Sequence, residues 1–207
     1  MANLLFVTSS LSGAASQSRA IAAEVVAAWR ANHPGATVTE RDLAADPVPH
    51  LGAATLGALA TPAGERSEAQ AANAGLADTL ITEVEAADAI VLAAPMYNFT
   101  IPSTLKAWFD HVARAGRTFR YTPAGPVGQL AGRPVIVVMT RGGLYSEGAA
   151  KAMDFQEPYL RAMLSFLGLT DVSFVHAEGQ ALGAEAAAAG LAKARAALGG
   201  LAPRAAA

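Results

Sequence analysis

The chain has 207 residues, of which 53% are apolar, and this is enough to close the core of one larger domain, so we expect a single domain over residues 1–207. A net charge of −2 provides no basic field for nucleic acid or for anionic lipid, and neither is expected as a partner. The absence of cysteine excludes disulfides, thiolate nucleophiles and thiolate-bound zinc or iron–sulfur sites, and it is consistent with a reducing cytoplasm.

A short apolar run, Asn3 to Val7, opens the chain. It lacks the charged lead of a signal peptide and is too short to span a membrane, so we interpret it as a strand. Positions 8–18 are rich in small hydroxyl residues, and a helical pattern of apolar residues follows from 19 to 30. Because a helix N-terminus offers unpaired amides to an anion, this order predicts a phosphate cradle. The alternative is that Ser16 or Ser18 only caps the helix, which is the commoner role of such a serine.

The next part of the chain moves from a regular pattern to an irregular one. Residues 32–35 are turn residues, and positions 37–43 alternate as a half-buried edge strand does. Residues 51–74 are rich in Ala, Gly and polar side chains and predict an irregular excursion, before a helix that runs through Leu76 to Val84. Such an excursion in a compact domain is more often a lid, a binding loop or an interface than a passive connector.

The stretch from Ala94 to Pro102 is the first candidate for a functional site. It follows the run 89–93, which is apolar throughout and therefore typical of a strand buried on both faces. In open α/β sheets, ligands bind beyond the carboxyl ends of such strands. Prolines at both ends of the stretch fix φ and set the amides between them, which suits a flat ring with polar edges. The alternative is a rigid connection in which Tyr97 and Phe99 are ordinary packing aromatics.

A helix over 104–115 is expected next, with Ser103 as its cap, and residues 116–128 predict a small hairpin outside the main sheet. Residues 135–139 form a second fully apolar run, and 140–143 follow it with two consecutive glycines. Glycines at such a position allow the backbone to approach a ligand closely. A simple tight turn is the alternative.

The last third of the chain adds one or two helices over 153–168, a strand over 170–177 and an Ala-rich helix over 183–198. Five strands that alternate with helices predict an α/β fold, a doubly wound five-stranded parallel sheet with helices on both faces. In the order 2-1-3-4-5, the loops after the first, third and fourth strands meet in one crevice. A hydroxyl-rich cradle, two aromatics and a glycine edge in that crevice suit a phosphorylated ring system such as FMN, which itself performs the redox chemistry.

The sequence lacks the motifs of hydrolases, of dinucleotide- or triphosphate-binding proteins and of metal sites. The chain contains no Gly-x-Ser-x-Gly elbow, no Gly-x-Gly-x-x-Gly fingerprint and no Walker pattern. Its four histidines, His33, His50, His111 and His176, have no metal-ligand spacing, so we expect no metal site. No ionisable side chain is expected to be catalytic.

Three motifs together resemble one family. They are Ala94 to Phe99, Ser16 to Ser18 and Arg141 to Gly143, and they are similar to motifs of the FMN-dependent NADH azoreductases, also described as NADH:quinone oxidoreductases, of flavodoxin-like fold. Further matching stretches are Arg41 to Ala45, Val112 to Gly116, Thr118 to Tyr121 and Ala177 to Gly179. The resemblance covers essentially the whole chain.

This resemblance implies a homodimer with FMN near the subunit interface. The FMN phosphate would contact Ser10, Ser16, Gln17 and Ser18. The isoalloxazine ring would be lined by Met96, Tyr97, Asn98 and Phe99, and its pyrimidine edge would meet Thr140, Arg141, Gly142 and Gly143. Two residues depart from the family pattern: Thr140 stands where a serine is usual, and Tyr145 replaces a histidine, a change that could alter potential or acceptor preference.

The resemblance also implies ping-pong turnover, in which NADH gives hydride to FMN and leaves before a quinone or azo compound takes it from the same face. One flat slot would serve both substrates, and the candidate walls are Phe99, Tyr121 and Phe166. Two other readings remain open. A flavodoxin-like electron carrier would need a protein partner and is usually strongly acidic, unlike this chain. A module that holds no cofactor would be colourless and could not be reconstituted with flavin.

Overall fold

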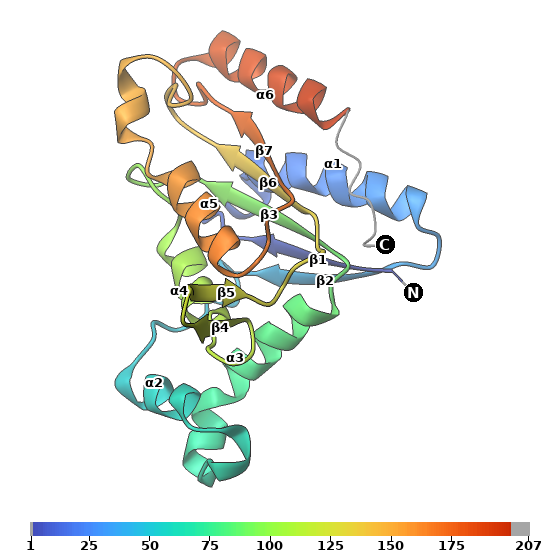
Figure 1. Cartoon of the computed structure of the whole chain (residues 1–207). Coiled ribbons are helices and arrows are strands. Elements are labelled where there is room, and N and C mark those ends of the chain that lie inside the picture. Colours follow the sequence, from blue (N-terminus) through green and yellow to red (C-terminus); the bar gives the residue numbers. More distant parts are fainter. Residues whose placement is uncertain (1, 200–207) are drawn as a thin grey trace.

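The computed structural model describes residues 2–199 (Figure 1). Met1 and residues 200–207, which belong to the expected domain 1–207, lie outside the described residues. A five-stranded parallel sheet forms the centre of the molecule, in the order β2-β1-β3-β6-β7. Its strands are β1 (Asn3–Thr8), β2 (Thr37–Asp42), β3 (Ala89–Pro95), β6 (Val135–Thr140) and β7 (Val172–Ala177).

The observed order is numbered differently from the expected 2-1-3-4-5, because the two strands of a separate hairpin come between β3 and β6 in the chain and are counted as β4 and β5. Its strands, β4 (Phe119–Thr122) and β5 (Gly125–Gly128), pair with each other in an antiparallel ladder and with no strand of the main sheet. The small hairpin predicted within residues 116–128 is therefore present, outside the sheet.

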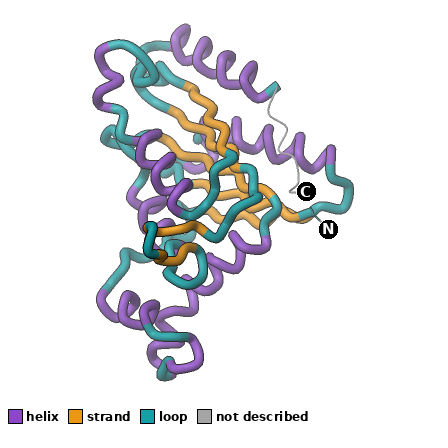
Figure 2. Tube along the Cα trace, in the orientation of Figure 1, coloured by secondary structure: helices purple, strands orange, loops and turns teal. Residues whose placement is uncertain are grey.

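Helices cover both faces of the sheet (Figure 2). One face carries α1 (Gln17–Asn32) and α6 (Ala184–Leu198), and the other carries α3 (Glu68–Ala86), α4 (Ser103–Val112) and α5 (Gln156–Phe166). Two apolar clusters, one on each face, make up the core. None of the helices within residues 2–199 is both long and apolar enough to cross a membrane.

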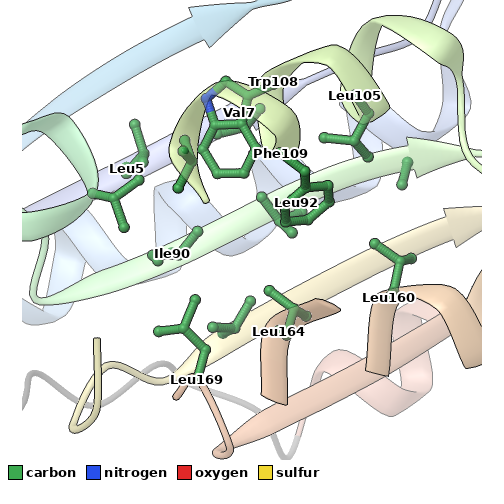
Figure 3. Packing of buried hydrophobic residues seen from close by; sticks show 14 of the residues in the cluster. Leu5, Val7, Ile90, Leu92, Leu105, Trp108, Phe109, Leu160, Leu164 and Leu169 are labelled. Atoms are coloured by element: carbon green, nitrogen blue, oxygen red, sulfur yellow. The ribbon is translucent and has the colours of Figure 1, made fainter. Parts of the chain in front are cut away.

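The central strand β3 separates the two apolar clusters, and all seven of its residues are buried. Because side chains alternate across a strand, Ile90 and Leu92 join the cluster under α3, α4 and α5, while Val91 joins the cluster under α1 and α6. Figure 3 shows Leu92 together with Phe109 of α4 and Leu164 of α5 on the first of these faces. Burial on both faces confirms what the unbroken apolar run predicts.

The segment 51–74 is not the irregular excursion that its composition suggests. It contains helix α2 (Ala53–Ala60), a 3-10 turn η2 (Ala63–Glu65) and the first turns of α3. Alanine is the strongest helix former, and it builds helices here without an obvious apolar stripe. Helix α3 begins with a capping box in which Ser67 and Gln70 bond to each other's backbone amides.

Helix α4 also differs from its prediction. Pro102 occupies the N-cap position, Ser103 is the first helical residue, and no side chain caps the helix. Its last helical residue is Val112, so the expected extension to residue 115 is wrong. A proline can precede a helix at no loss, because the amide it lacks would have no helical partner there.

The strand register brings the carboxyl ends of the sheet to one edge. Thr8 lies opposite Ala93, Pro95 lies opposite Thr140, and Thr140 lies opposite Ala177. The segments that leave β1, β3, β6 and β7 therefore start side by side. Two 3-10 turns, η1 (Gly13–Ala15) and η3 (Ala149–Met153), lie in the segments after β1 and β6.

Candidate functional site

A cavity of about 200 Å³ lies at this edge, between the segments that follow β1, β3, β6 and β7. It is lined by Ser10, Ser12, Ala15, Ser16, Gln17, Pro95, Met96, Tyr97, Thr140, Arg141, Gly142 and Gln180. Eight of the twelve residues expected to bind the cofactor belong to this lining. The other four, Ser18, Asn98, Phe99 and Gly143, lie beside it in the same segments.

The serine-rich segment caps helix α1 and, in the part of the chain that the structure describes, leaves unpaired donors beside the cap. Ser16 is the N-cap of α1, and its Oγ accepts a hydrogen bond of 3.2 Å from the amide of Arg19. The Oγ of Ser18, which is fully buried, lies 3.1 Å from that of Ser16. The amides of Gln17 and Ser18 have no partner among residues 2–199. A capped helix with two unpaired amides beside serine hydroxyls can bind an anion such as a phosphate.

The segment after β3 forms a tight two-residue turn. Tyr97 and Thr100 exchange two backbone hydrogen bonds, of 3.0 and 3.1 Å, and the residues between them have positive φ, 48° at Asn98 and 72° at Phe99. This is the geometry of a type I′ turn, in which glycine usually takes the second central position. Holding a phenylalanine there costs about 1–2 kcal/mol. Backbone strain of this kind is typical of functional sites.

Other contacts hold this turn in place. The amide of Met96 donates to Thr140 O at 2.8 Å, and the carbonyl of Phe99 accepts from the Phe155 amide at 3.0 Å. The amides of Asn98 and Phe99 have no partner within the described part of the chain. The turn therefore presents two amides next to the cavity, and the turn geometry, more than the two flanking prolines, sets their direction.

A second cavity, of about 700 Å³, is also lined by Tyr97. Its wall is mainly apolar and comes from the segment after β1, the turn, α4 and α5. It includes Leu11, Ile101 and Tyr159. Burial and the negative charge of Asp110 raise the pKa of Tyr159 to about 12, so this phenol is neutral at physiological pH.

The glycine pair after β6 forms an edge of backbone groups. The carbonyls of Arg141, Gly142 and Gly143 accept hydrogen bonds from the amides of residues 180, 181 and 179, at 2.9 to 3.1 Å. The amides of Gly142 and Gly143 have no partner among the residues described. A Cβ atom on Gly143 would lie 3.2 Å from the ring of Tyr145, so the glycine lets this ring approach the backbone.

The aromatic residues expected to wall a slot form two groups. Phe99 contacts Tyr145 edge-on, with ring centroids 6.2 Å apart. Phe166 and Tyr121 both pack on Phe119, with centroids at 4.4 and 5.4 Å. Tyr121 is 75% exposed at the hairpin. Within the described chain, the interactions thus pair Phe99 with Tyr145 and join Tyr121 and Phe166 through Phe119.

Comparison with known proteins identifies the family. Residues 2–201 match the family described as having a flavodoxin-like fold. The FMN-dependent NADH:quinone oxidoreductase of Herminiimonas arsenicoxydans is 52% identical over 193 residues, which are 93% of this chain and 95% of that protein. The protein of the same name from Azotobacter vinelandii is 49% identical over 94% of this chain and 96% of its own. The chain belongs to the family of FMN-dependent NADH:quinone oxidoreductases.

Solved structures agree with this family assignment. An azoreductase from Bacillus anthracis str. Sterne superposes with a TM-score of 0.80 at 31% identity and covers 95% of this chain and 99% of its own. An FMN-dependent NADH-azoreductase from Bacillus anthracis str. Ames Ancestor, solved in complex with FMN, has a TM-score of 0.85 at 26% identity, over 98% of this chain and all of its own. The resemblance that the three sequence motifs suggest is therefore confirmed.

Arg141 is one of the cavity-lining residues, but its side chain is fully buried from solvent. Its amide donates to Ala177 O at 3.0 Å. Its guanidinium bonds to Asp154 at 2.9 Å, to Glu178 at 3.1 Å and to Gln156 at 3.1 Å. The sequence motif places Arg141 at the site, but the donors of its side chain are engaged with the protein itself.

Glu178 lies next to the glycine edge, because the amide of the following residue, Gly179, bonds to Gly143 O. Its side chain accepts hydrogen bonds from the amides of Tyr145 and Ser146, at 2.8 and 2.9 Å, and from the Ser146 hydroxyl. Burial raises the pKa of Glu178, but the bonds from Ser146, Tyr145 and Arg141 outweigh burial and hold it below its ordinary value. Glu178 is therefore ionised at neutral pH.

Sequence reasoning missed some residues of the site. Ser12 and Gln180 line the cavity, and Leu11 donates its amide to the Oη of Tyr97 at 3.0 Å. Gln180 could have been found, because it follows the last strand at the same edge of the sheet as the other segments. Leu11 could not have been found in this way, because it contacts Tyr97 through its backbone amide and its apolar side chain does not indicate a functional role.

Three of the four histidines have structural partners. The Nδ1 of His33 lies 2.9 Å from Trp29 O, the Nε2 of His111 lies 3.1 Å from Pro49 O, and His176 lies 2.7 Å from Glu157. Residues 2–199 contain no group of three side chains placed to hold a metal ion.

Proposed function

We propose that this chain is an FMN-dependent oxidoreductase that moves two electrons from NADH to quinones and aromatic azo compounds, in ping-pong order. One observation carries the proposal: unpaired backbone amides from three separate segments converge at one edge of the sheet, and the cavity lining lacks carboxylate and histidine side chains. Such a site can bind and orient a redox group but has no carboxylate or imidazole to act as an acid or base. Membership of the family supports the same assignment.

The types of residue at this edge of the sheet suit FMN. The phosphate would be held by the amides of Gln17 and Ser18 and by the hydroxyls of Ser10 and Ser16, at the positive end of α1. The ring would lie against Met96, Tyr97, Asn98 and Phe99, and its pyrimidine edge against Thr140, Arg141, Gly142 and Gly143. When bound, FMN supplies the group that accepts and releases hydride.

The protein's own contribution is positional and electrostatic. The amides of Gly142 and Gly143 are fixed before any ligand arrives, because the carbonyls of their segment are bonded to residues 179–181. Fixed donors stabilise negative charge without the cost of reorganisation. They therefore favour the reduced, more electron-rich state of a ring bound against them.

The substrate slot requires flat apolar walls and room for one substrate at a time. Phe99, Tyr121 and Phe166 remain our candidates, and Tyr145 joins them because it packs against Phe99.

Two apolar side chains near the site are exposed to solvent: Phe99 is 39% exposed, and Leu11, which borders the larger cavity, is 67% exposed. We propose that a homodimer covers these apolar side chains and that the enzyme works in the cytoplasm; sedimentation analysis would test the first point.

Steady-state kinetics of the FMN-loaded protein test the proposal. NADH should be oxidised steadily with a simple benzoquinone as the acceptor and with no second protein present, and reciprocal plots at several quinone concentrations should be parallel. A flavodoxin-like electron carrier would instead require a protein partner, and intersecting lines would contradict the ping-pong order. Running NADPH in parallel would establish the donor preference.

A further inference from the structure

We infer that Arg141 and Glu178 form a buried positioning pair that holds residues 142–146 in the conformation that meets the flavin, while neither side chain touches the flavin. The inference rests on the proposed function, because it concerns the same site. It assigns Arg141 a different role from a direct ligand of the ring, and it assigns a role to Glu178, whose side chain lies outside the cavity lining.

The geometry of Arg141 supports a role inside the protein. Its side chain is 0% exposed, and its nitrogens are directed at Asp154, Gln156 and Glu178, which come from the start of α5 and the end of β7. A planar guanidinium holds several acceptors in one fixed arrangement, which a lysine cannot do. Arg141 thereby joins the ends of β6 and β7 to α5.

Glu178 extends this arrangement to the loop. One carboxylate accepts three hydrogen bonds from Tyr145 and Ser146 and one from Arg141. Residues 142 and 143 are therefore held at both ends, by the β6 strand before them and by Glu178 just after them. The two unpaired glycine amides lie between these anchors.

Gln156 connects the same pair to the second flavin-facing segment. Its Oε1 accepts from Arg141 Nε at 3.1 Å, and its Nε2 donates to Ala94 O at 2.9 Å. Ala94 immediately precedes Pro95 and Met96, where the turn segment begins. Since Gln156 is itself fully buried, the network fixes the glycine edge and the turn relative to each other.

The expected effect of loosening this network depends on the redox state of the flavin. Donors that are fixed in place stabilise the electron-rich reduced ring more than the oxidised ring. If the 142–146 segment becomes mobile, the reduced form should lose more affinity than the oxidised form. The midpoint potential of the bound flavin should then fall, by about 30 mV for each tenfold change in the ratio of the two dissociation constants.

The test compares Glu178→Gln with Asp78→Asn in the full chain. Glu178→Gln keeps the size of the side chain, but one carboxylate oxygen becomes an NH2 group, which cannot accept the hydrogen bonds that Arg141, Tyr145 and Ser146 donate. Asp78→Asn is the matched control, because Asp78 of α3 bonds the buried side chains of Arg66, which precedes α3, and Arg114, which follows α4, all outside the cavity lining. For each variant, unfolding by urea, the dissociation constant of oxidised FMN and the midpoint potential are measured.

We expect both variants to lose stability. Only Glu178→Gln should raise the dissociation constant of oxidised FMN, by about tenfold, and only it should shift the potential downward. A Glu178→Gln protein with unchanged potential, or one whose flavin properties match those of Asp78→Asn, would overturn the inference. Failure of the wild-type protein to bind FMN would instead overturn the proposed function.

A milder variant covers the case in which Glu178→Gln does not fold. Ser146→Ala removes a single hydroxyl donor to Glu178 and leaves the amide bonds of the loop in place. It should shift the potential in the same direction by a smaller amount. An unchanged potential in a folded Ser146→Ala protein, with Glu178→Gln unable to fold, would count against the inference.

Discussion

The amide of Leu11 donates a hydrogen bond of 3.0 Å to the Oη of Tyr97. This bond joins the segment after β1 to the turn after β3, two segments that are 86 residues apart in the chain. Tyr97 also lines both the 200 Å³ cavity and the 700 Å³ cavity. The phenol therefore ties the segment that we propose to hold the phosphate to the segment that we propose to line the ring.

Replacing Tyr97 with Phe should weaken FMN binding without unfolding the protein. The change removes one hydrogen bond, whose net worth is about 0.5–1.5 kcal/mol, and leaves the ring in place. We expect the dissociation constant of FMN to rise by about three- to tenfold. Fluorescence titration of the apoprotein measures this, and equal affinity for wild type and variant would show that the bond does not position the site.

The proposed position of the flavin ring limits the size of the side chain that residue 142 can carry. A Cβ there would lie 3.4 Å from the Cβ of Ala181, which is ordinary contact, so Gly142→Ala should fold and should nearly retain FMN affinity. Gly142→Val adds two further methyl groups, which should intrude on the ring edge and weaken FMN binding by at least about tenfold, or about 1.4 kcal/mol. Native circular dichroism with unchanged affinity in Gly142→Val would contradict the proposed ring position.

Two glycines within helices make a matched pair for stability. A Cβ on Gly190 of α6 would lie 2.0 Å from the carbonyl oxygen of Glu178, whereas a Cβ on Gly75 of α3 would meet nothing within 4 Å. Gly190→Ala should therefore destabilise the protein by about 1–3 kcal/mol, because the helix must move off the loop. Gly75→Ala should stabilise it by up to about 1 kcal/mol through helix propensity. Urea unfolding checks both; equal effects would show that α6 does not pack against Glu178 as described.

The parts of the fold that sequence could predict are those with a local physical signal. The runs 89–93 and 135–139 are apolar at every position, and their strands are buried on both faces. The helices of segment 51–74 carried a weaker signal, because Ala and Gly give no apolar stripe. The capping box at Ser67 and Gln70 was nevertheless visible in the sequence and marks the start of α3.

The candidate site was partly predictable for a related reason. Carboxyl ends of parallel strands meet at one edge, so the serine segment, the Tyr97 segment and the glycine pair could be placed together from the strand pattern alone. The positive φ of Phe99 could not be foreseen, because that conformation is normally given to glycine. The burial of Arg141 depends on Gln156 and Glu178, which are distant in the sequence, and no local pattern announces such a network.

Stability should fall at acid pH because of His111. Burial lowers the pKa of His111, and the charge of Arg114 acts in the same direction, while the bond to Pro49 O and the charge of Asp110 oppose them. The unfolded chain takes up a proton near pH 6.5, whereas the folded chain stays neutral to lower pH, so stability is lost as pH falls from about 6.5 toward the folded pKa.

The measurement is urea unfolding of wild type and His111→Gln at a series of pH values from 7.5 to about 5. Glutamine can still donate to Pro49 O but does not titrate. Wild type should lose up to about 1.4 kcal/mol per pH unit more than the variant within that window. Parallel stability curves for the two proteins would show that His111 is protonated equally in both states.

Whether FMN bound to this protein takes electrons from NADH is tested most directly by a visible absorption spectrum of the FMN-reconstituted protein, recorded before and after NADH is added in the absence of oxygen. We expect a yellow protein whose flavin absorption bleaches on addition of NADH and returns when a quinone is added. A protein that cannot take up FMN, or whose bound flavin stays oxidised with NADH, would contradict this expectation.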